Sequence, residues 1–173
     1  VHRLVEENHT PILFNRGQSA KRYGLELESI VGDRQDFDDF EAKVGDLSVD
    51  AVIDMITFGH ATAEHNLNVF RGKEAHYLFC STVCVYGGPL SSMPANEEES
   101  RTPVSDYGRG KVDAEIVFEQ AYATQGFPVT TFRPSHCYGP GQPLLDIWGY
   151  NPCLVNRIRE GRPIIVPGDG YGQ

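Results

Sequence analysis

The sequence predicts an α/β protein, a doubly wound parallel sheet between two layers of helices in a three-layer αβα arrangement. Two observations lead to this prediction. Short apolar runs recur along the chain, and segments with helical periodicity separate them. Strands joined in this way form βαβ units with a parallel sheet. The right-handed crossovers of such units place helices on both faces of the sheet.

Six apolar runs are predicted to be strands, and polar or turn-forming residues bound them. They cover residues 11–14, 27–31, 51–56, 75–80, 129–132 and 164–166. Asn15, Arg16 and Gly17 form a turn after the first run, and Gly32 and Asp33 stop the second.

Three segments are predicted to be helices, at residues 36–44, 61–71 and 106–124. The third has the clearest start, because Ser105 or Asp106 can cap it and Pro103 keeps the preceding segment extended. Apolar residues at helical spacing mark the faces that pack on the sheet. These residues are Ala63, Leu67 and Phe70 in the second helix, and Ala114, Val117, Phe118 and Ala121 in the third.

The composition argues against several classes of protein. The 173 residues, 40% of them hydrophobic, suffice for one globular core, so one domain is expected over residues 1–173. A formal net charge of −9 argues against a nucleic-acid partner. No apolar stretch reaches the roughly 20 residues of a membrane span, so no membrane partner is expected. The four cysteines form no Cys-x-x-Cys pair, and the histidines lack zinc spacing. We therefore expect reduced thiols, a cytoplasmic protein and no metal site.

Tyr107 and Lys111 carry the strongest chemical signal. Four positions apart at the start of a helix, their side chains lie on one face. An ammonium beside a phenol stabilises the phenolate and lowers the tyrosine pKa from about 10, which permits proton exchange near neutral pH. Ser81 and Thr82 follow the apolar run 75–80 and offer hydroxyls that could hold a substrate oxygen.

Three blocks of the sequence resemble the extended short-chain dehydrogenase/reductase superfamily, in its NAD-dependent epimerase/dehydratase branch. The blocks are residues 79–87 (FCSTVCVYG), residues 103–111 with Tyr107 and Lys111, and residues 133–141 (RPSHCYGPG). The resemblance implies a Rossmann-type domain that binds NAD(P), with residues 134–173 as the beginning of the substrate-binding part. It also implies that the family's Gly-rich phosphate loop and most of its C-terminal lobe lie outside this chain. We therefore interpret the chain as a fragment of a longer protein, truncated at both ends.

The resemblance implies catalytic roles for three residues. Tyr107 would be the acid/base of reversible hydride transfer, Lys111 would lower its pKa and bind the nicotinamide ribose, and Thr82 would orient the substrate oxygen. The implied cofactor-binding set is Asn15, Arg16, Asp33, Met55, Ile56, Thr57, Ser81, Tyr107, Lys111 and Pro134. The implied substrate-contacting set is Thr82, Tyr86 and His136, the last standing at the family's Asn position.

Two further features of the sequence narrow the expected reaction and the expected cofactor. Sugar-nucleotide 4,6-dehydratases carry Thr-Asp-Glu where this chain has Thr82, Val83 and Cys84, so dehydratase activity is disfavoured. Arg16 closes the strand that meets the adenosine ribose in the family. A carboxylate there selects NAD, whereas an arginine accommodates a 2′-phosphate, so NADP is expected in preference to NAD.

The expected function is that of an NAD(P)-dependent oxidoreductase or epimerase acting at a hydroxyl or keto carbon of a small molecule such as a nucleotide-sugar. A ketone reductase for a non-sugar substrate would use the same residues. The alternative from another class is a binding module that senses NADP(H) without turnover. Atypical members of the superfamily serve in this way, or as RNA-associated and assembly proteins. Family members often pair through the helix with the Tyr-x-x-x-Lys motif, so a homodimer is a further expectation.

Overall fold

The computed structural model describes residues 1–18, 25–73, 75–92, 94–135, 137, 145–146, 149–150 and 153–164. The chain divides into two compact units, Val1–Arg133 and Pro134–Gln173. The division falls at the residue where the sequence places the start of the substrate-binding part, and that role of the second unit stays a prediction.

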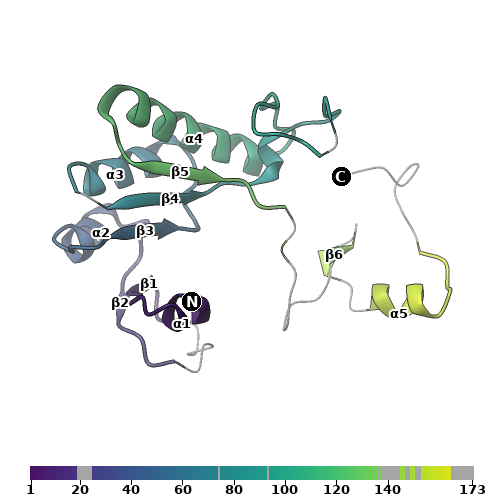
Figure 1. The fold of residues 1–173 in the computed structure, drawn as a ribbon, viewed down its shortest axis with the longest axis horizontal. Coiled ribbons are helices and arrows are strands. Elements are labelled where there is room, and N and C mark those ends of the chain that lie inside the picture. Colours follow the sequence, from purple (N-terminus) through teal and green to yellow (C-terminus); the bar gives the residue numbers. More distant parts are fainter. Residues whose placement is uncertain are drawn as a thin grey trace. The chain divides into compact units, whose positions relative to one another are not determined.

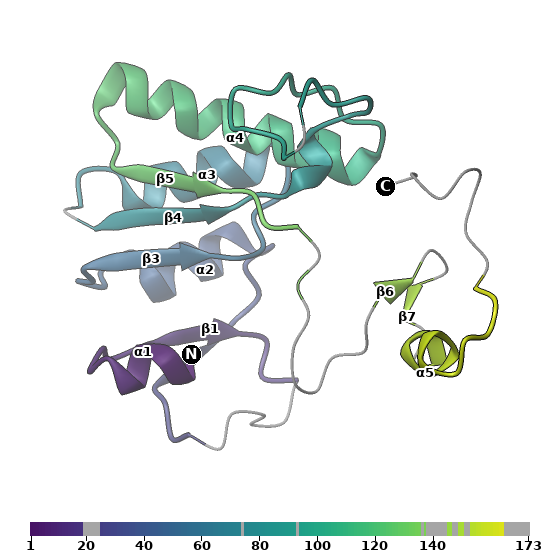
Figure 2. The same ribbon diagram turned by 45° about the vertical axis from the view of Figure 1, so that its right-hand side comes forward.

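The described residues of the first unit include five strands, all in parallel pairs. Strands β1 (Leu13–Asn15) and β2 (Ser29–Val31) pair with each other. Strand β4 (His76–Cys80) lies between β3 (Ala51–Asp54) and β5 (Val129–Phe132) in a three-stranded sheet. Figure 1 shows β3, β4 and β5 side by side with the same direction, and Figure 2 shows β1 beyond β3. Among the described residues, no backbone ladder joins β1 to β3.

Three helices connect the strands from β2 to β5 in the described part of the chain: α2 (Phe37–Val44), α3 (His60–Phe70) and α4 (Asp106–Gln125). Helix α1 (His2–Glu6) precedes β1, and a 3₁₀ turn covers Val83–Val85. In Figures 1 and 2, α2, α3 and α4 cover one face of the three-stranded sheet and α1 lies on the opposite side of the strands. This confirms the predicted α/β class, with parallel strands between helical layers.

Local sequence signals explain the ends of the helices. The side chain of Asp36 caps α2 by accepting a hydrogen bond from the Asp39 backbone N–H at 3.1 Å. Ser105, one of the two expected caps of α4, accepts from the Gly108 N–H at 3.1 Å. Helix α4 ends at Gly126, whose φ of 67° lies in the left-handed region that favours glycine.

The core lies between the sheet and helices α2–α4. Tyr77 and Phe79 point from β4 into it and are about 1% and 0% exposed. The apolar faces predicted for the two long helices are all buried, which confirms them: Ala63, Leu67 and Phe70 in α3, and Ala114, Val117, Phe118 and Ala121 in α4.

Some element boundaries differ from the sequence prediction. Strand β3 ends at Asp54, two residues before the end of the predicted run, because the Asp54 carboxylate accepts hydrogen bonds from the backbone N–H groups of Ile56 and Thr57. Those two residues therefore form a turn. Strands β1 and β2 each begin two residues later than predicted.

The second unit contains elements that the sequence analysis missed. These are the antiparallel strands β6 (Leu145–Asp146) and β7 (Gly149–Tyr150), and helix α5 (Cys153–Arg159). Of the predicted strand 164–166, Ile164 belongs to no strand and the other two residues lie outside the described part of the chain. No helix within the described ranges has the length and apolar character needed to span a bilayer.

Candidate active site

The carboxyl end of β4 carries the two predicted hydroxyl residues. Ser81 and Thr82 are 2% and 7% exposed. The Thr82 hydroxyl oxygen accepts a hydrogen bond from the Cys84 backbone N–H at 3.1 Å and so begins the 3₁₀ turn. Parallel strands bring their carboxyl ends to one edge of a sheet, which places these hydroxyls beside the end of β3.

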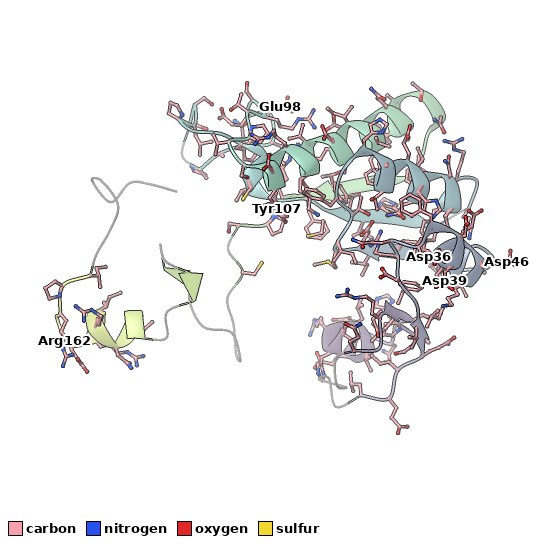
Figure 3. All side chains as sticks on the ribbon, turned by 180° about the vertical axis from the view of Figure 1, so that it is seen from behind. Asp36, Asp39, Asp46, Glu98, Tyr107 and Arg162 are labelled. Carbon is pink, nitrogen blue, oxygen red and sulfur yellow. The ribbon has the colours of Figure 1, made fainter. Side chains whose placement is uncertain are left out.

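Helix α4 brings Tyr107 and Lys111 to the same edge. Figure 3 shows Tyr107 at the N-terminal end of α4. The tyrosine ring is 49% exposed, whereas Lys111 is 3% exposed. Gly108 permits this close approach, since a Cβ atom there would lie 2.2 Å from the Cys84 carbonyl oxygen. The first turn of α4 is therefore packed against the 3₁₀ turn.

The Lys111 ammonium is held by two backbone carbonyls. It donates to the carbonyl oxygens of Thr57 and Cys80, both at 2.8 Å. Its nitrogen lies 5.9 Å from the centre of the Tyr107 ring. Burial lowers the pKa of Lys111, and the nearby Cys80 and Asp54 oppose that shift.

The expected lowering of the Tyr107 pKa by Lys111 is contradicted. The pKa of Tyr107 is raised, first by partial burial and then by the neighbouring Cys84 and Cys80. A hydrogen bond with the Thr82 side chain opposes the rise. The physical reason is that partial burial and the neighbouring cysteines favour the neutral phenol, while the hydrogen bonds of the lysine ammonium go to carbonyl oxygens.

Phe58 packs against the tyrosine. Its ring and the Tyr107 ring are nearly parallel, with centres 6.1 Å apart and an angle of 14° between their planes. Gly110 makes room for it, because a Cβ atom there would lie 2.4 Å from the Phe58 ring. Two glycines of the Tyr-Gly-Arg-Gly-Lys stretch thus serve close packing.

A cavity of about 1000 Å³ lies at the carboxyl ends of β1 and β2. Four of the predicted cofactor residues line it, and residues without a predicted role, Arg34 and Phe58 among them, also belong to its lining. The lining includes Asn15, Arg16, Asp33, Arg34, Ile56 and Phe58. Because Phe58 lines the cavity and stacks on Tyr107, it connects this space to the residues of the predicted acid/base site.

The turn after β1 is shaped by Asn15. Its side-chain oxygen accepts a hydrogen bond from the Gly17 backbone N–H at 2.8 Å, and Gly17 has a φ of 69°. This turn places Arg16 on the cavity wall, and Arg16 makes no ion pair within the described part of the chain. Its guanidinium is therefore available to an anionic ligand.

Three other predicted site residues do not line this cavity. Met55 is 57% exposed and is not part of the cavity lining, and Thr57 is fully buried in a polar cluster. The Tyr86 hydroxyl accepts from Arg133 at 2.7 Å and donates to the Asn96 carbonyl at 3.2 Å. The Tyr86 hydroxyl thus uses its hydrogen bonds on partners within the protein.

Two further predicted residues are not placed in the site. Pro134 begins the second unit, and His136 lies outside the described residues. Their contacts with a cofactor or substrate stay predictions.

Two buried ionic clusters were not predicted from the sequence. In one, Glu115 is fully buried and accepts hydrogen bonds from Arg133 and Arg101, each at 2.8 Å. Burial alone would raise the pKa of Glu115, but hydrogen bonds, that from Arg133 foremost, hold it below its usual value. In the other, Asp54 pairs with Arg34 at 2.8 Å. A carboxylate inside the apolar run 51–56 was the available signal for the second cluster.

No group of histidine, cysteine, aspartate and glutamate side chains in the described ranges could hold a metal ion. Cys84 and Cys137 are exposed thiols.

Comparisons with known proteins agree with the fold. The chain is 24% identical over 170 residues to a 2'-dehydrokanamycin reductase of Streptomyces kanamyceticus, covering 98% of this chain and 48% of that protein. It is 32% identical over 94 residues to the uncharacterized protein y4nG of Sinorhizobium fredii, covering 54% of this chain and 22% of that protein. The chain thus spans less than half the length of either relative.

Among solved structures, a dTDP-glucose 4,6-dehydratase from Bacillus anthracis in complex with NAD superimposes with a TM-score of 0.73 at 21% identity, covering 98% of this chain and 59% of that one. A UDP-N-acetylglucosamine 4-epimerase from Methanobrevibacter ruminantium superimposes with a TM-score of 0.72 at 20% identity, covering 97% and 60%. The sequence model of the NAD dependent epimerase/dehydratase family matches residues 1–173. This chain therefore belongs to the NAD dependent epimerase/dehydratase family.

Proposed function

We propose that the full-length protein is an NAD(P)-dependent oxidoreductase or epimerase that acts by reversible hydride transfer at a hydroxyl or keto carbon of a sugar. The observation that carries the proposal is the meeting of Thr82, Tyr107 and Lys111 at one edge of the sheet. A binding module without turnover has no need of all three groups together.

The cavity residues support a dinucleotide as the cofactor. A volume of about 1000 Å³ suits a large ligand, since ligand pockets span about 300–1000 Å³. Arg16 offers a cation for a 2′-phosphate, and Asp33 follows β2, where a carboxylate can meet adenine. We propose NADP as the preferred cofactor, with NAD as the alternative.

Each residue has a role in the proposed reaction. A bound nicotinamide supplies the hydride donor or acceptor. Thr82 holds the substrate oxygen by its hydroxyl, and Tyr107 gives a proton to that oxygen or removes one from it. Lys111 places a positive charge near the phenol. Two of its three N–H groups donate to carbonyl oxygens, and the third can bind a ribose hydroxyl.

The raised pKa of Tyr107 keeps its phenol protonated at neutral pH, the form that donates a proton in the step of reduction. A tyrosine that is protonated at neutral pH is ready to donate to a keto oxygen, and burial keeps it protonated. The similarity to a 2'-dehydrokanamycin reductase supports a keto-sugar reductase. The similarity to nucleotide-sugar epimerases supports the other reading, in which the keto sugar is an intermediate.

Deuterium transfer tests the proposal. Full-length protein is incubated with NADPH carrying deuterium at C4 and with a panel of UDP-sugars, dTDP-sugars and keto sugars, and the products are analysed by mass spectrometry and NMR. If the protein is a reductase, we expect deuterium on a sugar carbon of the product. If it is an epimerase, we expect inversion at a sugar carbon in a parallel incubation with unlabelled NAD(P)⁺. The Tyr107→Phe protein should give neither product. Equal turnover by the Tyr107→Phe protein would refute the assignment.

A further inference from the structure

Asp54 is the most heavily hydrogen-bonded carboxylate in the described part of the chain. It is 3% exposed and accepts from both terminal nitrogens of Arg34, at 2.8 and 3.2 Å. It also accepts from the Asn66 amide at 3.1 Å and from the hydroxyls of Tyr77 and Thr57. The carboxylate is thus saturated with donors from α3, β4 and the segment after β2.

The same carboxylate fixes the turn that follows β3. Its Oδ1 atom accepts from the backbone N–H groups of Ile56 and Thr57, both at 3.0 Å. The Thr57 hydroxyl is held in addition by Asn66 at 2.6 Å and by Arg34 at 2.8 Å. Thr57 is therefore anchored through its backbone and through its side chain, and its carbonyl has a defined direction.

That carbonyl is one of the two acceptors of Lys111. The ammonium donates to it at 2.8 Å. Two residues after Thr57, the Gly59 N–H donates to the carbonyl oxygen of Gly110, the residue before Lys111, at 3.0 Å. This hydrogen bond joins the same loop to α4 beside the lysine. A shift of the turn would therefore move a contact of Lys111 without any change in α4 itself.

The surroundings of Lys111 leave it dependent on these contacts. It is 3% exposed, so water has little access to replace a lost carbonyl. The charged and titratable groups around it are Cys80 at the end of β4, Asp54 at the end of β3, Arg34 after β2, and Glu115 and Tyr107 on α4. In the described structure, its direct hydrogen-bond partners are the carbonyls of Thr57 and Cys80.

We propose that Asp54 is a positioning residue for Lys111, because it fixes the Thr57 carbonyl that orients the lysine ammonium. Arg34, Asn66 and Tyr77 complete the support by holding the carboxylate in place. The importance of this arrangement for turnover rests on the proposed function, in which Lys111 acts beside Tyr107.

Competitive acetylation of lysines reads out the position of Lys111 without any turnover. The full-length protein and its Asp54→Asn variant are treated with trace acetic anhydride, and the acetylated peptides are quantified by mass spectrometry. Lys73 is the internal control, because its ammonium is also held by backbone carbonyls, those of Val44, Gly45 and Leu47. We expect acetylation of Lys111 to rise about tenfold in the variant, as the loss of one hydrogen bond to a charged group implies, and that of Lys73 to stay constant.

A second pair of variants separates positioning from a general loss of structure. Thr57→Val removes the hydroxyl that Asp54 holds at nearly constant volume, and Thr57→Ser keeps it. We expect Thr57→Val to raise the acetylation of Lys111 selectively and Thr57→Ser to behave like the unchanged protein. Unchanged Lys111 acetylation in both Asp54→Asn and Thr57→Val would overturn the proposal. An equal rise at Lys73 in both variants would overturn it too, since Asp54 would then serve the whole fold.

The acetylation experiment tests the position of Lys111 whether or not the proposed reaction is correct. If the protein transferred no deuterium to any sugar while acetylation followed the expected pattern, the reaction would be refuted and the Asp54–Lys111 relationship would stand. If deuterium transfer occurred, kcat should fall in Asp54→Asn and Thr57→Val and recover in Thr57→Ser.

Discussion

The Lys111 ammonium lies 2.8 Å from the carbonyl oxygen of Thr57, a residue of the turn that Asp54 fixes at the end of β3. A lysine of helix α4 is thereby joined to a different βα connection. Its direction follows from long-range packing and not from its spacing to Tyr107. The Tyr107 ring centre lies 5.9 Å from this ammonium, and the pKa of Tyr107 is raised, first by partial burial.

Replacement of Tyr107 by phenylalanine removes only the phenolic oxygen. General acid/base catalysis contributes roughly 10²–10⁴-fold to a rate, so kcat should fall by about that factor. The stacking with Phe58 involves the ring and is retained, so the NADPH dissociation constant should hardly change. Steady-state kinetics and fluorescence titration of the same preparations measure the two quantities. A large loss of NADPH affinity would contradict the separation of binding from chemistry.

Glu115 should be far more important for stability than its neighbour Glu119. Both accept from Arg101, but Glu115 is fully buried and also holds Arg133, whereas the Glu119 side chain is 49% exposed. Glu115→Gln should lower the free energy of unfolding by about 1.5–3 kcal/mol, since the partly buried Arg101 and Arg133 lose hydrogen bonds to a buried charged group. Glu119→Gln, the matched control, should cost about 0–1 kcal/mol. Urea denaturation gives both values, and equal effects would contradict the account.

The low pKa of Asp54 predicts a loss of stability in acid. Burial alone would raise this pKa, but the hydrogen bonds and charge of Arg34, with those of Thr57 and Tyr77, hold it well below its usual value. The unfolded pKa is about 3.9, so the stabilisation is present above that pH and is lost as pH falls towards the folded pKa. The free energy of unfolding should therefore decline below about pH 4.

The Asp54→Asn variant isolates this contribution. It lacks the titrating carboxyl, so its free energy of unfolding should depend less steeply on pH below about pH 4 than that of the unchanged protein. Glu115, whose pKa is also lowered, titrates in both proteins and cancels in the comparison. Urea denaturation at several acidic pH values gives the two curves. Parallel curves would show that Asp54 titrates alike in the folded and unfolded chain.

Gly110 should be intolerant of alanine only while Phe58 is present. A Cβ atom at this position would lie 2.4 Å from the Phe58 ring, and overpacking of this kind costs about 1–3 kcal/mol. With Phe58→Ala in the background, the clash disappears, and alanine should then stabilise the helix by about 0.5–1 kcal/mol. A double-mutant cycle by urea denaturation measures the coupling. Additive effects would mean that the ring and the helix do not touch.

The sequence predicted best what depends on local chemistry. Helix α4 and strand β5 were expected almost at their observed bounds, because the Ser105 cap and the apolar periodicity are signals within the segment itself. The short strands and helix of the second unit lack such a signal. Strand β3 was predicted too long, because an apolar run continues past Asp54 while the carboxylate turns the backbone.

Only those residues of the candidate site that lie in local sequence motifs were predicted. Thr82, Tyr107 and Lys111 belong to recognisable blocks of sequence. The partners of Asp54 lie up to 23 residues away along the chain and come together only through the sheet and helix packing. Phe58 likewise meets Tyr107 through tertiary contact, and no pattern near either residue indicates the pair.

The proposed dinucleotide site is best tested by a fluorescence titration of the full-length protein with NADPH and NADH, repeated with Arg16→Ala. We expect both nucleotides to bind and NADPH to bind more tightly. The variant should lose about tenfold or more in affinity for NADPH alone, as loss of a charge-assisted hydrogen bond to a phosphate implies. If neither nucleotide bound, the proposal of a dinucleotide-dependent enzyme would be contradicted.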